Sequence, residues 1–315
     1  MKRGKAIRRT LRRPIETFAF RFAMVVVPWF PRWLLVSLLR IAGHATYYLA
    51  GRERHTGMAN LNVVFGDRIP KAGKRRILKR SFASFALTMA DMFWFSKDTE
   101  KRIRKYQLFV PDSGPFFENR AQLIITAHTG NWELIGLESG LLGLNIASVA
   151  AITKNAAVDT LLNTLRQKTG QSIIPREGAL RTLINRFRQN GKAAFVLDQN
   201  TSENQGGIWV DFLGIPTPVS PAPALLSYRS GTEIIFAFSQ PVGSGYYEAH
   251  TGPVIQPPAY DKNGDQARIV QALTQQIMDV ISAQILAHPE SWLWSYKHWR
   301  SHAPGTDPAL YPVYT

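Results

Sequence analysis

The strongest constraint on the fold is an alternation of short apolar segments and longer amphipathic segments between residues 122 and 239. Apolar runs of about 4–8 residues bounded by turn residues are typical of buried strands. The expected strands are Gln122–His128, Ile146–Thr153, Ser172–Pro175, Ala193–Gln199 and Glu233–Ser239. The expected helices between them are Asn131–Leu142, Ala156–Gly170 and Gly178–Gly191. This order predicts an α/β fold with a mixed, largely parallel sheet covered by helices.

The N-terminal region is basic at first and then apolar. Its opening, MKRGKAIRRTLRRPIE, contains seven Lys or Arg residues and one Glu. An apolar run follows over Thr17–Gly51, but residues such as Arg21 and Pro28 interrupt it. A membrane-spanning helix needs about 20 predominantly apolar residues, so we predict an N-terminal helical membrane anchor over residues 1–55 that lies on the membrane surface. A buried helical hairpin and a true span are the alternatives.

The charge of the chain predicts an anionic partner. The formal charge is +16 and the sequence pI is about 10.2, which suits an anionic membrane surface, an acidic carrier protein or a nucleic acid. No nucleic-acid recognition motif accompanies the charge, so we expect no nucleic acid. Part of the charge lies in the basic first half of an expected helix over residues 71–95. That basic end either contacts lipid headgroups or is solvated.

Two polar residues fall at the ends of expected strands. These are His128 and Asp198, and ligands of open α/β sheets bind beyond the carboxyl ends of strands. Glu133 follows His128 by five positions. If a turn at Gly130 folds the chain back, the Glu133 carboxylate orients the imidazole as in a catalytic triad, and His128 becomes a general base on an alcohol. The alternative is a satisfied core histidine beside a surface glutamate.

Other common catalytic templates are missing from the sequence. It contains no G-x-S-x-G elbow, no P-loop, no H-E-x-x-H and no G-x-G-x-x-G. It also contains no cysteine, which excludes disulfides, thiolate metal sites and a cysteine nucleophile. Direct attack by a substrate hydroxyl is therefore the simplest mechanism, and no pattern indicates a metal ion or a cofactor. The proline-rich segment Gly214–Ala224 is expected to be a loop near the site.

The segment HTGNWE, from His128 to Glu133, resembles the H-x4-[DE] motif of the lauroyl/myristoyl acyltransferase family of lipid A biosynthesis, within the lysophospholipid acyltransferase-like superfamily. Further segments resemble the same family in the same order, and together they cover most of the chain. They are Ala59–Asp67, Leu165–Leu183, Val196–Asn200 and His288–Arg300. Tyr296 departs from the pattern because a histidine is expected there, which puts a catalytic role of the C-terminal tail in question.

The resemblance implies an acyltransferase domain over residues 56–315. It implies that an acyl chain passes from acyl carrier protein to a hydroxyl of a lipid A precursor or a related glycolipid, without a cofactor and without a covalent enzyme intermediate. His128 is then the base, and Glu133 orients it. The implied location is the cytoplasmic face of the inner membrane. Transfer to another membrane lipid, with acyl-coenzyme A as the donor, is one alternative, and a non-catalytic basic membrane-surface protein is another.

Three further residues are candidates for substrate binding. Arg166 and Asp198 match positions that the family uses in its site, and Asn131 lies inside the motif. Arg166 is suited to neutralise a phosphate or an oxyanion, and Asp198 to position the substrate or an arginine. The alternatives are an exposed helix arginine for Arg166, a turn or helix cap for Asp198 and a local helix cap for Asn131.

Overall fold

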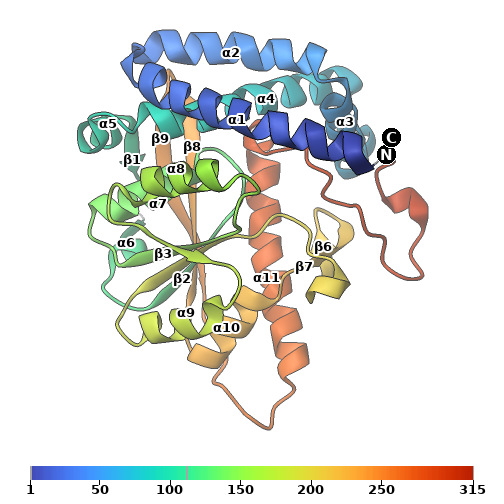
Figure 1. Ribbon diagram of the computed structural model, residues 1–315. Helices are drawn as coiled ribbons and strands as arrows, with labels where there is room; N and C mark the ends of the chain where they lie inside the picture. The colour runs from blue at the N-terminus through green and yellow to red at the C-terminus, as the bar shows by residue number, and fades with distance from the viewer. Residues whose placement is uncertain (1, 111–112, 315) are drawn as a thin grey trace.

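A seven-stranded sheet forms the centre of the computed structural model, which describes residues 2–110 and 113–314, and of residues 2–12 the backbone alone. The strand order is β1-β9-β8-β2-β5-β3-β4 (Figure 1). The strands are β1 (Gln107–Phe109), β2 (Gln122–Thr126), β3 (Ile146–Ala150), β4 (Ser172–Pro175), β5 (Lys192–Val196), β8 (Ile234–Gly243) and β9 (Tyr246–Ile255). The β8–β9 pair is antiparallel and the other neighbours are parallel. The expected mixed, largely parallel sheet is confirmed.

Helices cover both faces of this sheet (Figure 1). They are α5 (Thr99–Tyr106), α6 (Gly114–Phe117), α7 (Trp132–Leu141), α8 (Ala156–Gln167), α9 (Ala179–Phe187), α10 (Ala222–Ser230) and α11 (Gln266–Ala287). The central strand β2 is buried along its whole length. Leu123 and Ile125 belong to one apolar cluster and Ile124 to another, as expected for a strand covered on both faces.

The proline-rich segment is not the loop that the sequence suggested. Five of its eleven residues form β7 (Ile215–Val219), which pairs with β6 (Ile208–Phe212) in a separate antiparallel hairpin, and α10 begins at Ala222. A two-stranded hairpin leaves one edge of each strand unpaired, so it tolerates prolines that lack an N–H donor. The segment does lie near the site as expected, because Ser220 and Ala222 line the cavity beside His128 that is described below.

Four helices form the N-terminal part. They are α1 (Lys2–Val26), α2 (Arg32–Leu49), α3 (Gly51–Phe65) and α4 (Lys71–Trp94). Figure 1 shows α1 and α2 on the outside of the molecule, and α2 packs on α4. None of the helices within the described ranges is sufficiently long and apolar to span a bilayer. The basic side chains before Arg13 lie outside the described residues, and the expected boundary at residues 55/56 falls within α3.

Strand register determines where the site forms. β5 lies directly beside β2, and Thr126 pairs with Val196. His128 and Asp198 each lie two residues beyond this pair. Because the two strands are parallel, both residues emerge at the same edge of the sheet and at the same depth.

Candidate active site

His128 and Asp198 form a tightly coupled pair at this edge. The imidazole Nδ1 lies 2.6 Å from Asp198 Oδ1, and the backbone N–H of His128 donates to Asp198 Oδ2 at 3.0 Å. Asp198 is 1% exposed, whereas the His128 side chain is 22% exposed. The carboxylate therefore fixes both the ring and the backbone of His128, and the ring keeps one side open.

The C-terminal tail holds Asp198 in place. Trp292 Nε1 donates to Asp198 Oδ2 at 2.7 Å, and His298 Nδ1 lies 3.1 Å from the Asp198 carbonyl oxygen. The two rings stack with their centroids 4.1 Å apart. Burial raises the pKa of Asp198, but His128, His298 and the Trp292 hydrogen bond outweigh burial and lower it to about 2. Burial lowers the pKa of His298 to about 4, so this ring is neutral near pH 7.

His128 has the electrostatics of a poised base. Burial lowers its pKa, but the charge and hydrogen bond of Asp198 outweigh burial, and the pKa is raised. Trp132 makes a T-shaped contact with the ring, with centroids 4.8 Å apart. Nδ1 is occupied by Asp198, and within the described part of the chain no hydrogen bond reaches Nε2. Nε2 is thus the atom that is free to accept a proton.

Glu133 does not make the contact expected from the sequence. Its carboxylate makes a bidentate pair with Arg166, with Oε1 2.5 Å from Nη2 and Oε2 2.9 Å from Nε. Glu133 lies in the first turn of α7 and Arg166 in the last turn of α8, so the side chain reaches across to the neighbouring helix. The orienting contact to His128 is made by Asp198 instead. This is a correction to the predicted pairing, although both glutamate and arginine line the same cavity as His128.

Asn131 is a helix cap that also connects the motif to a buried polar network. Its Oδ1 accepts from the Leu134 N–H at 3.3 Å, and its Nδ2 donates to Asp91 Oδ2 at 3.1 Å. Asp91 also pairs with Arg32 and accepts from the Tyr247 hydroxyl at 2.6 Å. Asn131 is 1% exposed and is not among the residues that line the cavity. The structure therefore favours the cap over direct substrate contact.

Gly130 allows the tight turn after His128. Its φ is +57°, and a Cβ there would lie 2.0 Å from the Ser239 carbonyl oxygen, so another residue would be both strained and obstructed. The Gly130 N–H donates to the Ser291 carbonyl at 3.0 Å, and the Asn131 N–H donates to the Ser239 carbonyl at 2.8 Å. These two amides fix the turn and are not available to an oxyanion.

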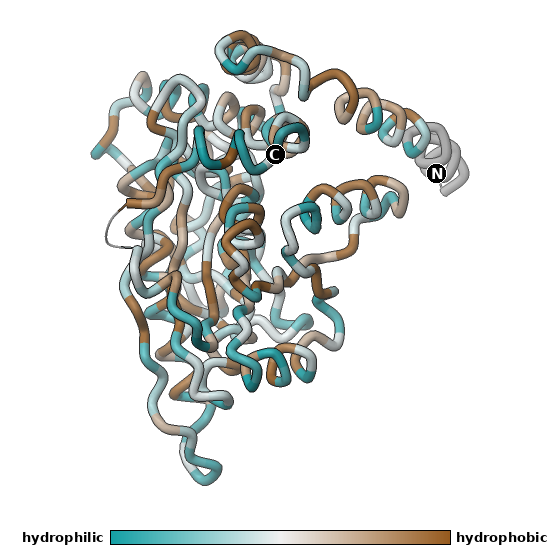
Figure 2. Tube along the Cα trace, turned by 90° about the vertical axis from the view of Figure 1, so that its left-hand side faces the viewer, coloured by the Kyte–Doolittle hydropathy of each residue, from teal (hydrophilic) through white to brown (hydrophobic). Residues whose placement is uncertain are grey.

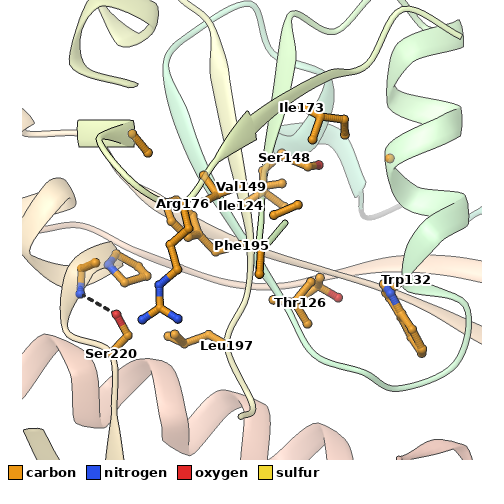
Figure 3. A pocket seen from close by; sticks show the side chains of 18 of the residues that line it. Ile124, Thr126, Trp132, Ser148, Val149, Ile173, Arg176, Phe195, Leu197 and Ser220 are labelled. Carbon is orange, nitrogen blue, oxygen red and sulfur yellow. Dashed lines mark hydrogen bonds between the residues drawn. The ribbon is translucent and has the colours of Figure 1, made fainter. Parts of the chain in front are cut away.

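A cavity of about 520 Å³ opens beside the imidazole, within the range of about 300–1,000 Å³ typical of small-molecule sites. Apolar side chains from the sheet and from α8 and α9 line its interior, including Ile124, Ile146, Leu162 and Leu183. Figure 3 shows Trp132 on one side of the cavity and Arg176 with Ser220 on the other. His128, Glu133, Arg166 and Arg176 supply the charged or ionisable groups of its lining. The site thus combines an apolar interior with a base.

Sequence reasoning missed several residues of this arrangement. Trp132 lies inside the quoted motif, and Trp292 and His298 lie inside the quoted tail. Trp132 contacts His128 in the same motif, whereas the roles of the two tail residues depend on contacts with Asp198 at the end of a distant strand. The concentration of aromatic residues in the tail was the available signal. Tyr296, which departs from the family pattern, donates to Asn200 Oδ1 at 3.3 Å, and Asn200 also lines the cavity.

Two phosphatidylinositol mannoside acyltransferases are similar to the chain. The Mycobacterium tuberculosis (strain CDC 1551 / Oshkosh) protein is 26% identical over 176 residues, 55% of this chain and 52% of that protein. The Mycolicibacterium smegmatis protein is 23% identical over 234 residues, 71% of this chain and 72% of that protein. The match thus spans about half the length of the first relative.

A solved 1-acyl-sn-glycerophosphate (LPA) acyltransferase, PlsC, from Thermotoga maritima aligns with 79% of this chain and 95% of its own, at 13% identity and a TM-score of 0.34. The assignment does not rest on that alignment. Residues 1–301 match the family described as bacterial lipid A biosynthesis acyltransferase, a match that covers the N-terminal helices, the sheet, the cavity and the tail. The chain belongs to the bacterial lipid A biosynthesis acyltransferase family.

Proposed function

We propose that this protein transfers a fatty acyl chain from acyl carrier protein to a hydroxyl of a lipid A precursor or a related glycolipid. The observation that carries the proposal is the free Nε2 of His128 beside an apolar cavity, with Nδ1 held 2.6 Å from Asp198. A positioned base and an apolar cavity are the two features that acylation of an alcohol requires. Membership of the family supplies the reaction class.

The proposed reaction needs no covalent enzyme intermediate. His128 Nε2 removes the proton from the acceptor hydroxyl while its oxygen attacks the thioester carbonyl carbon. The tetrahedral intermediate collapses, the carbon–sulfur bond breaks, and the imidazolium returns the proton to the departing thiolate. Asp198 stabilises the imidazolium between these two steps. A general base of this kind contributes roughly 10²–10⁴ in rate.

Two arginines that line the cavity, Arg166 and Arg176, are suited to binding anionic or polar parts of the substrates. Arg166 is oriented by Glu133 through two hydrogen bonds, and Arg176 forms no ion pair with a carboxylate within the described part of the chain. In the proposal the acyl chain occupies the apolar interior. The phosphate groups or the developing oxyanion lie near the arginines.

The N-terminal helices support attachment to a membrane surface at the cytoplasmic face of the inner membrane. Large apolar side chains recur every three or four residues along α1 and into α2, and all are more than half exposed. They are Ile15 67%, Phe18 71%, Phe22 58%, Val25 67%, Trp29 71% and Trp33 70%. Figure 2 shows brown, apolar stretches along the N-terminal helix. Exposed apolar side chains of this kind are suited to the boundary between headgroups and acyl chains.

A second candidate acceptor follows from the relatives. Both proteins described above are named phosphatidylinositol mannoside acyltransferases, so a mannoside lipid is the alternative acceptor, and acyl-coenzyme A is the alternative donor that the family resemblance allows. The charged groups and the apolar side chains that line the cavity suit either acceptor. The choice of donor and acceptor therefore defines the experiment.

The test is a transfer assay with purified protein in mixed micelles. Each acceptor, a lipid A precursor or a phosphatidylinositol mannoside, is offered with either acyl carrier protein or coenzyme A as the acyl donor, and products are identified by mass spectrometry. We expect acylation of the lipid A precursor from the carrier-protein thioester, and loss of that product in His128→Ala. Faster acylation of the mannoside lipid from the coenzyme A thioester would select the alternative, and absence of transfer in all four combinations would contradict both.

A further inference from the structure

A second cavity lies away from the sheet, between α3 and the beginning of α4. Its volume is about 570 Å³. One face of α3 lines it over successive turns, and the C-terminal tail, which Figure 1 shows returning beside α3, closes one side. The lining residues used below are Arg54 and His55 on α3, Lys71 and Arg75 on α4, and Val313 in the tail. None of these residues lines the cavity beside His128.

This second cavity is cationic and contains no counter-charge. Arg54, Lys71 and Arg75 line it together with His55, and no Asp or Glu is among the lining residues. Within residues 2–110 and 113–314, no carboxylate forms an ion pair with any of the three cations. Lys71 and Arg75 are one helical turn apart, so they present their charges on the same side of α4. Three like charges around one hollow favour binding of an anion.

Arg54 is already oriented for such a ligand. Its Nη1 donates to the carbonyl oxygens of Tyr47 and Tyr48, both at 3.1 Å. The guanidinium is therefore fixed at the end of α2, while Nε and Nη2 donate no hydrogen bond to any described residue. Behind the cavity, Lys74 is 7% exposed and donates to Asn62 Oδ1 at 3.0 Å. Asn62 lines the cavity, so a buried fourth cation lies directly behind its wall.

The surroundings indicate that the anion belongs to a lipid. Tyr48 and Leu49, which end α2 beside this cavity, are 62% and 85% exposed, and Val313 in its wall is 75% exposed. We propose that this cavity binds the phosphate-bearing headgroup of an anionic membrane lipid that is not a substrate. The lipid phosphate lies among Arg54, Lys71 and Arg75, and its acyl chains pass Leu49. The inference rests on the proposed membrane attachment, but it requires no acyl transfer.

A matched pair of double variants tests the proposal. Lys71→Gln/Arg75→Gln removes two charges from the cavity, and Arg76→Gln/Arg80→Gln removes two exposed charges from the same helix at the same spacing, outside the cavity. Binding is measured by sedimentation with phosphatidylcholine vesicles and with mixed phosphatidylcholine–phosphatidylglycerol vesicles. Each basic group near an anionic surface contributes about fivefold in binding. We therefore expect about a 25-fold loss on mixed vesicles for the cavity variant and a smaller loss for the control.

The pattern of binding separates this inference from the proposed function. Neutral vesicles should bind the wild type and both variants equally, because the apolar face of α1 and α2 is unchanged. A loss on neutral vesicles too would mean that the substitutions disturb the apolar attachment, and would overturn the headgroup site. Equal losses on mixed vesicles for both variants would also overturn it, because a diffuse field would then explain the data. No acyl donor is present, so failure of catalysis has no bearing on the result.

A second measurement distinguishes a lipid headgroup from free phosphate. Thermal melts are recorded with inorganic phosphate and, at the same concentration, with a short-chain phosphatidylglycerol below its aggregation threshold. We expect the lipid to raise the melting temperature of the wild type more than inorganic phosphate does, and the increase to be lost in Lys71→Gln/Arg75→Gln. An equal increase from both ligands would assign the cavity to a free anion and overturn the lipid proposal.

Discussion

The two ends of the neighbouring strands β2 and β5 both bury ionisable groups, but in opposite ways. At the carboxyl ends, Asp198 holds His128 through Nδ1 and leaves Nε2 beside a cavity. At the amino ends, Gln122 pairs in register with Lys192. Lys192 Nζ donates to Gln122 Oε1 and to the Glu118 carbonyl, the latter at 2.8 Å. At the carboxyl ends, Nε2 of His128 has no hydrogen-bond partner in the described part of the chain. At the amino ends, the Lys192 ammonium is hydrogen-bonded.

This difference shows that burial and a shifted pKa do not by themselves identify a functional group. Burial lowers the pKa of Lys192 to about 8, yet neither cavity described above includes it. Its hydrogen-bond partner Gln122 donates in turn to Glu233 Oε1 at 2.8 Å, so these polar side chains bond to one another. A saturated buried charge stabilises the fold, whereas a buried base with one free atom beside a cavity is equipped for chemistry.

The largest effect should come from removing the imidazole. His128→Ala should lower kcat by roughly 10²–10⁴, and the melting temperature should also fall, because the buried Asp198 carboxylate loses the imidazole that lowers its pKa. Steady-state transfer assays and thermal melts measure the two quantities. If the folded His128→Ala variant retained normal turnover, the carboxyl ends of the strands would matter no more for catalysis than the amino ends, which would contradict the comparison.

The next largest effect should come from the partner of the imidazole. Asp198→Asn keeps the size of the side chain but removes the charge that stabilises the imidazolium, so we expect turnover to fall by at least about tenfold. A general base works when neutral, so activity should rise with pH through the pKa of His128, which lies above its ordinary value. In Asp198→Asn burial continues to lower that pKa while the carboxylate no longer raises it. The acidic limb of the kcat/KM profile should therefore move to lower pH, and an unchanged limb would contradict the role of Asp198.

Glu133 should have a smaller effect, because it acts through Arg166. Glu133→Gln releases one side of the bidentate pair, and we expect a loss of about tenfold, equivalent to about 1.4 kcal/mol in the transition state. The double variant Glu133→Gln/Arg166→Gln should lose no more activity than Arg166→Gln alone. Additive losses in this double-mutant cycle would show that Glu133 acts independently of the arginine.

The smallest effect on turnover should come from the amino ends of the strands. Lys192→Met leaves the Glu118 carbonyl and Gln122 Oε1 without their donor, and we expect a loss of about 1–3 kcal/mol in the free energy of unfolding. Turnover per folded molecule should be unchanged. Urea unfolding and active-site-normalised rates measure these separately. A selective loss of kcat would remove the distinction between the two ends.

Local sequence patterns were sufficient to predict many of the strands and helices of this protein. Apolar runs located β2 and β5, the longer segments between the expected strands located α7 and α8, and interruptions in the N-terminal run predicted helices that do not span a membrane. The positions of His128 and Asp198 at strand ends were also readable. Each of these features depends on residues close together in the chain, whose spacing selects a helix or a strand. The separate β6–β7 hairpin was missed because prolines are read locally as breakers.

Only the tertiary structure decided which residues meet. The sequence places Glu133 five positions after His128 and Asp198 seventy positions after it, which favoured the wrong partner. The strand order sets β5 beside β2, and the Thr126–Val196 register then carries Asp198 to the imidazole, while α7 directs Glu133 towards α8. The tail closes the arrangement through Trp292. Strand order and register result from burying many apolar side chains at once, so no spacing within one segment encodes them.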